Sequence, residues 1–553
     1  MARVSALASD AVRLVPLGGL GEIGMNCFAL EQSDGILVVD CGIAFPDNDL
    51  GVDVVHADFS WLLERSERIA GVFLTHGHED HVGALPYLLN EIDVPVWGPP
   101  HALAVARRRL LERDFLPREL DLRPARAGER HAVGPFRVEP VRVTHSIVEA
   151  SALSIATRAG IVLHTGDFNL DPDPPDGEPT NEARLAAIGD AGVALMLSDS
   201  TNSHVPERSG SERSVARAVE GLAERATGRV VVSMFASNVQ RLITFGDIAR
   251  RLGRKICVFG RSLDAQIAIA KELGYLRWPS DLTIGIEEAQ GFPRERLFVL
   301  AGGTQAEPGS ALQRFAVGQH PALKLEPGDS VILSSRVIPG NERGVAHLHN
   351  DLLRLGVTLH SWLTDPEVHT SGHAARNEQL RMIELLRPRC FLPVHGQLQH
   401  LLSHAELARD AGAAETAVVE DGTPIVCDGH SLVRERAIQH GRVSILKGGE
   451  PASESTLRAR AELARSGIVT VALVEDERGR SAAAPRIAAR GVPGVEDDAA
   501  LRALELEAAR AVDAHRDGRG LDRNEFVRRA VRRKVEDLSG TRPVVEVLTS
   551  RVD

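Results

Sequence analysis

The chain has 553 residues, which is more than one hydrophobic core of ordinary size accommodates, so two to four domains are expected. Hydrophobic residues make up 43% and charged residues 25%, as in ordinary globular proteins, and no apolar run reaches the roughly 20 residues that cross a bilayer. The net charge of −12 and the aromatic content of 4% argue against a broad basic or base-stacking surface, although a local basic lining is compatible with both.

The cysteines and the N-terminal stretch both indicate the cellular compartment in which the protein works. There are five cysteines, an odd number, and none forms a CxxC pair. The stretch MARVSALASDAVRLVPLGG has no clean apolar core followed by a cleavage site. We therefore expect a cytoplasmic protein with reduced thiols and no membrane association.

The first 200 residues are typical of short apolar strands joined by glycine-rich turns. Strands are predicted in VRLVPLGG, MNCFALEQ, GILVVDCG and IAGVFLTHG, and then in PFRVEPVRVTHS, GIVLHTGDF and VALMLSDST. Histidine or aspartate stands at the C-terminal end of several of them. Because strand ends meet at one edge of a sheet, this pattern predicts a site along one edge of an α/β domain with αββα layers.

One glycine motif imitates a dinucleotide site. Gly19, Gly21 and Gly24 have the GxGxxG spacing after a predicted strand. A dinucleotide site needs a helix next, with an acidic residue on the following strand, whereas MNCFALEQ reads as a strand. We interpret this turn as one that brings backbone close to the predicted site.

The pattern changes near residue 207. Alternating strands and helices from 207–350 predict an inserted parallel-sheet domain, after which VHTSGHA and CFLPVHGQ resume the histidine-bearing strand ends. The first domain is therefore predicted to be split, with parts 1–206 and 351–428. A linker is predicted over 429–455 and a small α/β C-terminal domain over 456–553.

The stretch FLTHGHEDHVGALP concentrates ligand-capable side chains in one loop. Dense histidine has no good packing role, whereas zinc accepts imidazole nitrogen and carboxylate oxygen. The HxHxDH motif can supply ligands to two adjacent metals, and a carboxylate that lies between two cations is the natural bridging ligand. Alone, each later residue could be an ordinary polar histidine or turn aspartate. The predicted ligands are His76, His78, Asp80 and His81 in the loop and His145, Asp167 and His395 at other strand ends, with Asp40 orienting a ligand imidazole or capping a turn.

These residues resemble the metallo-β-lactamase superfamily, and later segments narrow the resemblance to its β-CASP branch. SDSTN at 198–202, TSGHA at 370–374 and PVHGQ at 393–397 look like the motifs which that branch adds. The ordered set PLGGLGEIGMN, THGHEDHVGALPYLL, HTGDF, FASNVQR, PGNE, SGHA and RPVVEV is similar to the bacterial ribonuclease J family over essentially the whole chain. Asn169 stands where that family is expected to have lysine.

The resemblance implies a metallo-β-lactamase sandwich split by a β-CASP domain, with two Zn²⁺, or Mn²⁺ or Mg²⁺ as working metals. It implies a ribonuclease that degrades single-stranded RNA from the 5′ end and also cuts internally, in RNA maturation and mRNA decay. His76, His78 and His145 would hold one metal, Asp80, His81 and His395 the other, and Asp167 would bridge. The implied catalytic residues are Asp80, Asp199, which would orient the nucleophile or handle a proton, and His373, which would contact the scissile phosphate.

RNA contacts are predicted in turns and at a helix start, where backbone N–H groups favour phosphate. The alternative is an ordinary helix cap or strand-end turn. A homodimer or homotetramer through the C-terminal domain and an RNA-degradation complex are further expectations. Two other functions stay open, a thioester or lactone hydrolase and an RNA-binding scaffold of a decay complex. The predicted RNA-binding residues are Ser237, Asn238, Ser334, Ser335, Arg336, Ser371 and His373.

Overall fold

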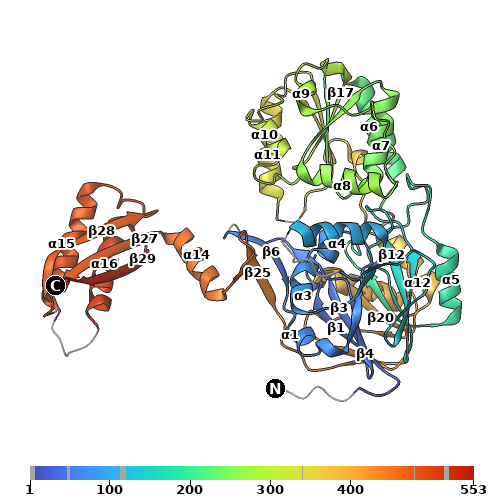
Figure 1. The fold of residues 1–553 in the computed structure, drawn as a ribbon, viewed down its shortest axis with the longest axis horizontal. Coiled ribbons are helices and arrows are strands. Elements are labelled where there is room, and N and C mark those ends of the chain that lie inside the picture. The colour runs from blue at the N-terminus through green and yellow to red at the C-terminus, as the bar shows by residue number, and fades with distance from the viewer. Residues whose placement is uncertain are drawn as a thin grey trace. The chain divides into compact units, whose positions relative to one another are not determined.

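The computed structural model describes residues 7–46, 50–112, 120–338, 340–478, 480–515 and 522–552. The chain divides into two compact units. Unit 1 comprises Met1–Asp47 and Val54–Val443, and unit 2 comprises Asn48–Asp53 and Ser444–Asp553 (Figure 1). Among the described helices, none has both the length and the apolar character needed to cross a membrane.

Unit 1 contains two large sheets that pack face to face. Their shared core takes Phe28 and Leu30 from the first sheet and Ile155 and Leu197 from the second, all at most 1% exposed. The first sheet has the order β24 (Leu432–Arg434), β23 (Ile425–Cys427), β1 (Val12–Gly18), β3 (Cys27–Gln32), β4 (Gly35–Val39), β7 (Ile69–Phe73), β8 (Val96–Gly98) and β9 (Leu122–Pro124). The second has the order β10 (His131–Val133), β11 (Phe136–Arg142), β12 (Ser151–Thr157), β13 (Gly160–His164), β14 (Val193–Asp199), β20 (Cys390–Val394) and β22 (Glu415–Thr416).

Helices cover the outer faces of the two sheets, which gives the αββα layers (Figure 1). A second core cluster joins Leu185, Met382 and Leu407 to the outer face of the second sheet. The predicted sandwich is confirmed. The helices on the first sheet's side are α1 (Ser60–Leu63), α2 (Glu79–Val82), α3 (Leu85–Glu91) and α4 (Pro100–Glu112), and those on the second are α5 (Glu182–Ala191), α12 (Arg376–Leu386) and α13 (Leu398–Asp410).

Strand register aligns the polar strand ends. β4 and β7 run parallel with Val39 opposite Phe73, so Asp40 and the histidine loop leave the sheet together. β14 and β20 run parallel with Asp199 opposite Val394, which places Asp199 beside the residue that precedes His395. Parallel strands end at the same edge, and this is why segments distant in sequence meet there.

The glycine turn that imitates a dinucleotide motif lies beside this edge. β2 (Leu20–Gly21) pairs in parallel with β21 (Gly396–Gln397), and Leu20 stands opposite Gly396. The turn therefore reaches the residue that follows His395, and a strand, β3, follows it as predicted.

The insert has a sheet whose neighbouring strands all run parallel, as predicted. Apolar clusters fill both faces of this sheet, beneath three helices on each side (Figure 1). The strand order is β16 (Lys255–Phe259), β17 (Leu297–Ala301), β15 (Val230–Met234), β18 (Ser330–Ser334) and β19 (Thr358–Ser361). The helices are α6 (Glu212–Arg225), α7 (Val239–Arg251) and α8 (Arg261–Glu272) on one face and α9 (Ile286–Ala289), α10 (Ala311–Ala316) and α11 (Glu342–Arg354) on the other.

A buried carboxylate ties the insert together far from the strand-end edge. Asp329 is fully buried and accepts hydrogen bonds from the Arg229 guanidinium at 3.0 Å and the Arg294 guanidinium at 2.8 Å. Asp329→Ala is expected to lower the free energy of unfolding by about 3–5 kcal/mol, because it removes the nearest carboxylate of buried Arg229 and the acceptor of the Arg229 and Glu326 backbone N–H groups. Urea denaturation measures this loss. An unchanged midpoint, or a changed metal content of the folded variant, would contradict the assignment.

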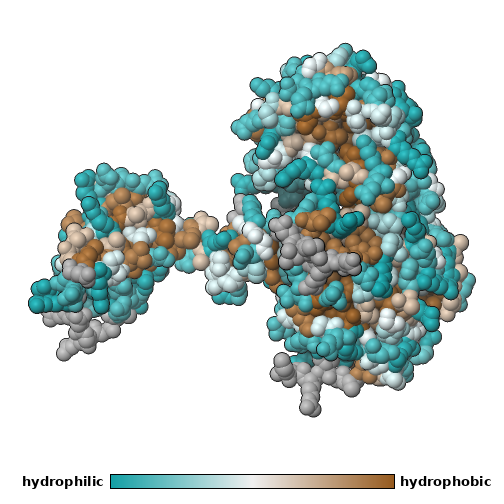
Figure 2. Space-filling model, viewed as in Figure 1, coloured by the Kyte–Doolittle hydropathy of each residue, from teal (hydrophilic) through white to brown (hydrophobic). Residues whose placement is uncertain are grey.

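Unit 2 is a small α/β domain. β27 (Ile468–Glu475) lies between antiparallel β28 (Ser481–Arg490) and parallel β29 (Val544–Arg551). Val527, Val531 and Val535 form a buried stripe, four residues apart, that packs α16 (Arg523–Ser539) on this sheet. Teal, hydrophilic residues cover much of the visible surface of each unit, and brown apolar ones are scattered among them (Figure 2).

The remaining elements are short or belong to unit 2. The helices of unit 2 are α14 (Glu454–Ser466), α15 (Asp498–Ala514) and α16 (Arg523–Ser539). Further short strands are β5 (Ile43–Ala44), β6 (Val52–Ala57), β25 (Arg442–Leu446) and β26 (Pro451–Ala452). The 3₁₀ turns are η1 (Ser66–Arg68), η2 (Arg294–Arg296) and η3 (Pro366–Val368).

Candidate metal centre

The strand ends of both sheets deliver histidine and aspartate to one place. The loop after β7 and the helix α2 that follows it carry the four predicted ligands of HGHEDH, and Asp167 follows β13. His395 directly follows β20 with φ of 52°, and Asp40 directly follows β4 with φ of 58°. Such left-handed backbone is uncommon outside glycine and concentrates at functional sites. Within unit 1, all seven predicted ligands fall into two four-residue groups that share Asp167.

The first group has the spacing of a metal's ligand shell. His78 Nδ1 lies 3.1 Å from His76 Nε2 and 3.1 Å from His145 Nε2. Asp167 Oδ2 lies 3.7 Å from His76 Nε2 and 3.8 Å from His145 Nε2. Tetrahedral zinc with bonds of about 2.0 Å places its ligand atoms about 3.3 Å apart, so these four side chains fit a zinc-sized cation.

The second group fits equally well. Asp167 Oδ2 lies 3.2 Å from His81 Nε2 and 3.6 Å from His395 Nε2. Asp80 Oδ2 lies 3.6 Å from His81 Nε2 and 3.4 Å from His395 Nε2. Asp167 Oδ2 thus belongs to both groups, which is the position of a carboxylate shared by two cations.

Burial and neighbouring charges shift the pKa values of these histidines in opposite directions. Burial lowers the pKa of His78 to about 3 and, together with neighbouring imidazoles, lowers that of His76 well below its ordinary range. Both are therefore neutral, the form that binds metal. Burial also opposes the charged form of His395, but the charge of Asp167 and the Asp80 hydrogen bond raise its pKa to about 9, so a metal that binds His395 would displace a proton. Asp167 is ionised, because His395 and His81 outweigh its burial and hold its pKa well below the usual range.

A layer of hydrogen bonds orients the imidazoles. Asp40, fully buried, accepts from His81 Nδ1 at 2.7 Å, from Thr75 N at 2.8 Å and from the Thr75 hydroxyl at 2.8 Å. His145 Nδ1 donates to the Gly372 carbonyl at 2.7 Å. Each contact occupies one ring nitrogen and leaves Nε2 facing the centre, as in carboxylate–histidine–metal arrangements.

Asp40→Ala is expected to weaken metal binding by about 10–100-fold, because His81 loses the acceptor that sets its tautomer. Titration of the metal-free protein with Zn²⁺ in competition with a chelating dye measures the change. Asp34→Ala, at an exposed aspartate just before β4, is the matched control. If Asp40→Ala binds Zn²⁺ with the affinity of the parent protein, Asp40 is a turn residue with no role in metal binding.

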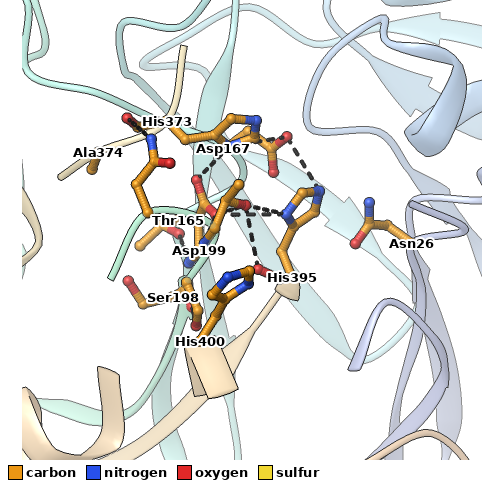
Figure 3. Close-up of polar contacts among 12 residues, drawn as sticks. Asn26, Thr165, Asp167, Ser198, Asp199, His373, Ala374, His395 and His400 are labelled. Carbon is orange, nitrogen blue, oxygen red and sulfur yellow. Dashed lines mark hydrogen bonds and ion pairs between the residues drawn. The ribbon is translucent and has the colours of Figure 1, made fainter. Parts of the chain in front are cut away.

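Asp199 and His373 lie side by side at the edge of the centre (Figure 3). His373 Nδ1 lies 2.8 Å from Asp199 Oδ2, and the Thr201 hydroxyl joins Asp199 Oδ1 and His395 Nδ1 at 2.7 Å each. Burial opposes the charge on His373, but the charge and hydrogen bond of Asp199 raise its pKa. These two residues, with Asp167 and His395, form a third cluster of ligand-capable atoms.

The turn that carries His373 is held by two amide side chains. Asn202 Nδ2 donates to Ser371 Oγ at 2.9 Å and to the His373 carbonyl at 3.0 Å. Asn169 Nδ2 donates to the Ser371 carbonyl at 3.1 Å. Asn169, which replaces an expected lysine, therefore has a structural contact of its own.

The predicted RNA-binding residues divide into exposed and internal side chains. Arg336 is exposed, with its guanidinium 5.3 Å from the Trp362 ring centre, and Ser237 is half-buried. Asn238 is buried, and its Oδ1 accepts from the Arg241 backbone N–H as the N-cap of α7. The hydroxyls of Ser334 and Ser335 bond within the protein, the first to the Val368 carbonyl and the second to the Thr304 hydroxyl.

Sequence reasoning did not identify several residues that shape the centre. Thr75, Thr201 and Asn202 adjoin predicted residues in FLTHG and SDSTN, so adjacency to a motif is the available signal. Asn26, whose Nδ2 lies 3.1 Å from His81 Nε2, lies in PLGGLGEIGMN. Arg241 is the last residue of the motif FASNVQR, but the motif gives no sign that this arginine is buried.

Four family profiles match the chain in order. They are the metallo-beta-lactamase superfamily at 20–232, the ribonuclease J beta-CASP domain at 227–352, the Zn-dependent metallo-hydrolase RNA specificity domain at 367–419 and the ribonuclease J C-terminal domain at 455–552. The metallo-β-lactamase fold implies divalent metal binding, and the two donor groups are suited to it. The RNA specificity domain supports RNA as the substrate.

Curated relatives match most of the chain. The ribonuclease J of Helicobacter pylori (strain ATCC 700392 / 26695) is 35% identical over 496 residues, which are 89% of this chain and 72% of that protein. Those of Synechocystis sp. and Mycobacterium tuberculosis (strain CDC 1551 / Oshkosh) are each 36% identical, over 90% and 92% of this chain and 79% and 92% of theirs.

Among solved structures, a protein of unknown function from Enterococcus faecalis V583 matches with a TM-score of 0.54 and 18% identity. The match covers 75% of this chain and 100% of that one, and it shows the fold alone. The family follows from the profiles and the curated relatives together. The chain belongs to the ribonuclease J family, nucleases with a metallo-β-lactamase fold and an inserted β-CASP domain.

Proposed function

We propose that the chain is a zinc-dependent cytoplasmic ribonuclease that degrades single-stranded RNA from the 5′ end and also cuts it internally, in RNA maturation and mRNA decay. One observation carries the proposal. Two complete sets of metal-ligand side chains share Asp167, and the Asp199–His373 pair lies beside them. A thioester or lactone hydrolase has no evident use for the insert and its turns. An RNA-binding scaffold has no need of a complete set of metal ligands.

In this proposal His76, His78 and His145 would hold one Zn²⁺, Asp80, His81 and His395 would hold the other, and Asp167 would be shared by both. The nitrogen and oxygen donors suit zinc, and Mn²⁺ or Mg²⁺ is the alternative working metal. When bound, such a pair supplies a hydroxide near neutral pH and a Lewis acid for the phosphate.

The proposed chemistry of the chain's own residues follows from their placement. Asp199, next to His395, orients the attacking oxygen and accepts its proton. His373, whose Nδ1 is held by Asp199, donates a proton from its other ring nitrogen to the leaving oxygen as the P–O bond breaks. Asp80, whose side chain is 31% exposed, lies at the open side of the centre.

For RNA binding we propose that Arg336, Ser237, Ser371 and His373 contact the phosphates. Arg336 brings a charge with no carboxylate partner among the described residues, and its guanidinium suits phosphate. For Asn238, Ser334 and Ser335, which the sequence predicts as RNA-binding, we propose that their internal hydrogen bonds hold the contacting turns in place.

We further propose domains at 1–206 with 351–428, 207–350 and 456–553, joined by 429–455, with the insert extended to Ser361 because β19 pairs with β18 in its sheet. We also propose a homodimer or homotetramer formed through the C-terminal domain within an RNA-degradation complex. Exposed Leu506 and Leu548, at 61% and 56%, support association through the C-terminal domain. Sedimentation analysis of the full chain tests this, and a monomer at micromolar concentration would reject it.

The proposed function is tested by metal analysis together with cleavage of one RNA bearing a 5′-monophosphate, triphosphate or hydroxyl. We expect two equivalents of zinc, stepwise release of mononucleotides and the fastest degradation of the monophosphate. Hydrolysis of thioester or lactone substrates without RNA cleavage would establish the rival enzyme. RNA binding without any hydrolysis would establish the scaffold.

A further inference from the structure

Arg241 is a fully buried arginine on α7 with every guanidinium N–H engaged. It is 1% exposed, and its Nε and Nη2 donate to the two Glu212 carboxylate oxygens at 2.9 Å each. Nη1 donates to the Ser334 carbonyl at 2.6 Å and to His369 Nδ1 at 3.0 Å, and Nη2 also donates to the Thr370 carbonyl at 3.0 Å. Five donors thus meet five acceptors, the full capacity of the group.

These partners come from separate parts of unit 1. Glu212 begins α6, and its backbone N–H donates to Asp171 Oδ2 at 2.8 Å, on the side of the second sheet. Ser334 ends β18 of the insert. His369 and Thr370 belong to the segment that returns from the insert, directly before the turn of Ser371 and His373. The guanidinium therefore joins the insert to the segment that carries a candidate catalytic histidine.

Stability alone does not explain this arrangement. A buried ion pair is costly to desolvate, and hydrophobic residues of similar volume are often as stabilising. A planar guanidinium with all five donors engaged, in contrast, fixes the directions of its acceptors. The acceptors here include the Thr370 carbonyl, one residue before Ser371 and three before His373.

We propose that Arg241 is a positioning residue for RNA cleavage, an inference that rests on the proposed function. By holding the Thr370 carbonyl it sets the register of the following turn, in which His373 Nδ1 meets Asp199 Oδ2 at 2.8 Å. By holding the Ser334 carbonyl it anchors the neighbouring turn of Ser335 and Arg336. One side chain thereby aligns the proposed RNA-contacting turn with the proposed proton donor.

The test is Arg241→Lys in the full-length zinc-loaded protein, because lysine keeps the charge and loses the planar fork. With saturating 5′-monophosphorylated RNA we expect kcat to fall about 10²-fold, the cost of misplacing a catalytic group by about 1 Å. Hydrolysis of bis(p-nitrophenyl) phosphate, whose leaving group departs without a proton donor, should change far less. Zinc content should stay parental.

Arg254→Lys is the matched control. Arg254 is also a buried arginine of the insert, 6% exposed, and it donates to the carbonyls of Gly228 and Ala226 at 2.8 Å each. It precedes β16 and contacts none of the proposed catalytic or RNA-binding residues. Its replacement should lower thermal stability without changing the ratio of kcat values on the two substrates.

Other outcomes would overturn the inference. A parental kcat on RNA in Arg241→Lys would do so, as would equal losses on both substrates or losses matched by Arg254→Lys. Should Arg241→Lys not fold, Glu212→Gln removes the ion pair at constant size, and it must show the same selective loss in smaller degree. A parent protein that cleaves no RNA would reject the proposed function, and this inference with it.

Discussion

His78→Ala is expected to abolish RNA cleavage while RNA binding stays measurable. His78 Nδ1 lies 3.1 Å from the nearest nitrogens of both His76 and His145, so it sits in the middle of the first donor group. Its loss leaves that group one ligand short. Cleavage should fall by at least about 10³-fold, because water that no metal holds has a pKa far above the value of about 7 that metal-bound water reaches.

Metal content by atomic emission and single-turnover cleavage together check this prediction. RNA affinity, measured by fluorescence anisotropy, separates lost chemistry from lost binding. His347→Ala, at an exposed histidine on α11, is the matched control and should behave like the parent protein. Full activity in His78→Ala with parental metal content would reject the assigned first site.

His373→Ala is expected to slow RNA cleavage by about 10²–10⁴-fold, the usual contribution of a general acid. Its metals should stay bound, because His373 lies outside the two donor groups that share Asp167. Hydrolysis of bis(p-nitrophenyl) phosphate should suffer much less, since p-nitrophenolate leaves without protonation. Asp199→Asn should also slow cleavage, because it disturbs the 2.8 Å contact that holds His373.

The decisive measurement for His373→Ala is its zinc stoichiometry, taken together with its rates on RNA and on bis(p-nitrophenyl) phosphate. A variant that loses zinc would place His373 among the ligands, as its presence in the cluster with Asp167, Asp199 and His395 allows. Equal losses on both substrates would show that His373 does not protonate the leaving oxygen. Either result would require a new assignment of the proton donor.

Much of the fold could be predicted, because its signals are local. Short apolar strands with histidine or aspartate at their ends indicated the αββα layers, and the alternating pattern after residue 207 indicated a parallel sheet. The family profiles and the structure confirm both. The HGHEDH loop was equally informative, since four ligand-capable side chains in six residues have no packing role.

The orienting contacts could not be predicted, because they pair ordinary residues across the chain. Asn202 contacts the His373 carbonyl across 171 positions, and Asn169 contacts the Ser371 carbonyl across 202. Amide side chains are common in loops, so neither stands out. Arg241 is harder still, because an arginine within a helix is usually a solvated side chain, whereas this one is 1% exposed.

The sequence by itself determined which donor atoms the protein has and that four of them share one loop. Only the tertiary structure decided how they are grouped. His395 and Asp80 are 315 positions apart, yet their ligand atoms lie 3.4 Å from each other. The physical reason is strand register: parallel β14 and β20 end together beside β13, and the packed core between the two sheets brings this edge against the loop that follows β7.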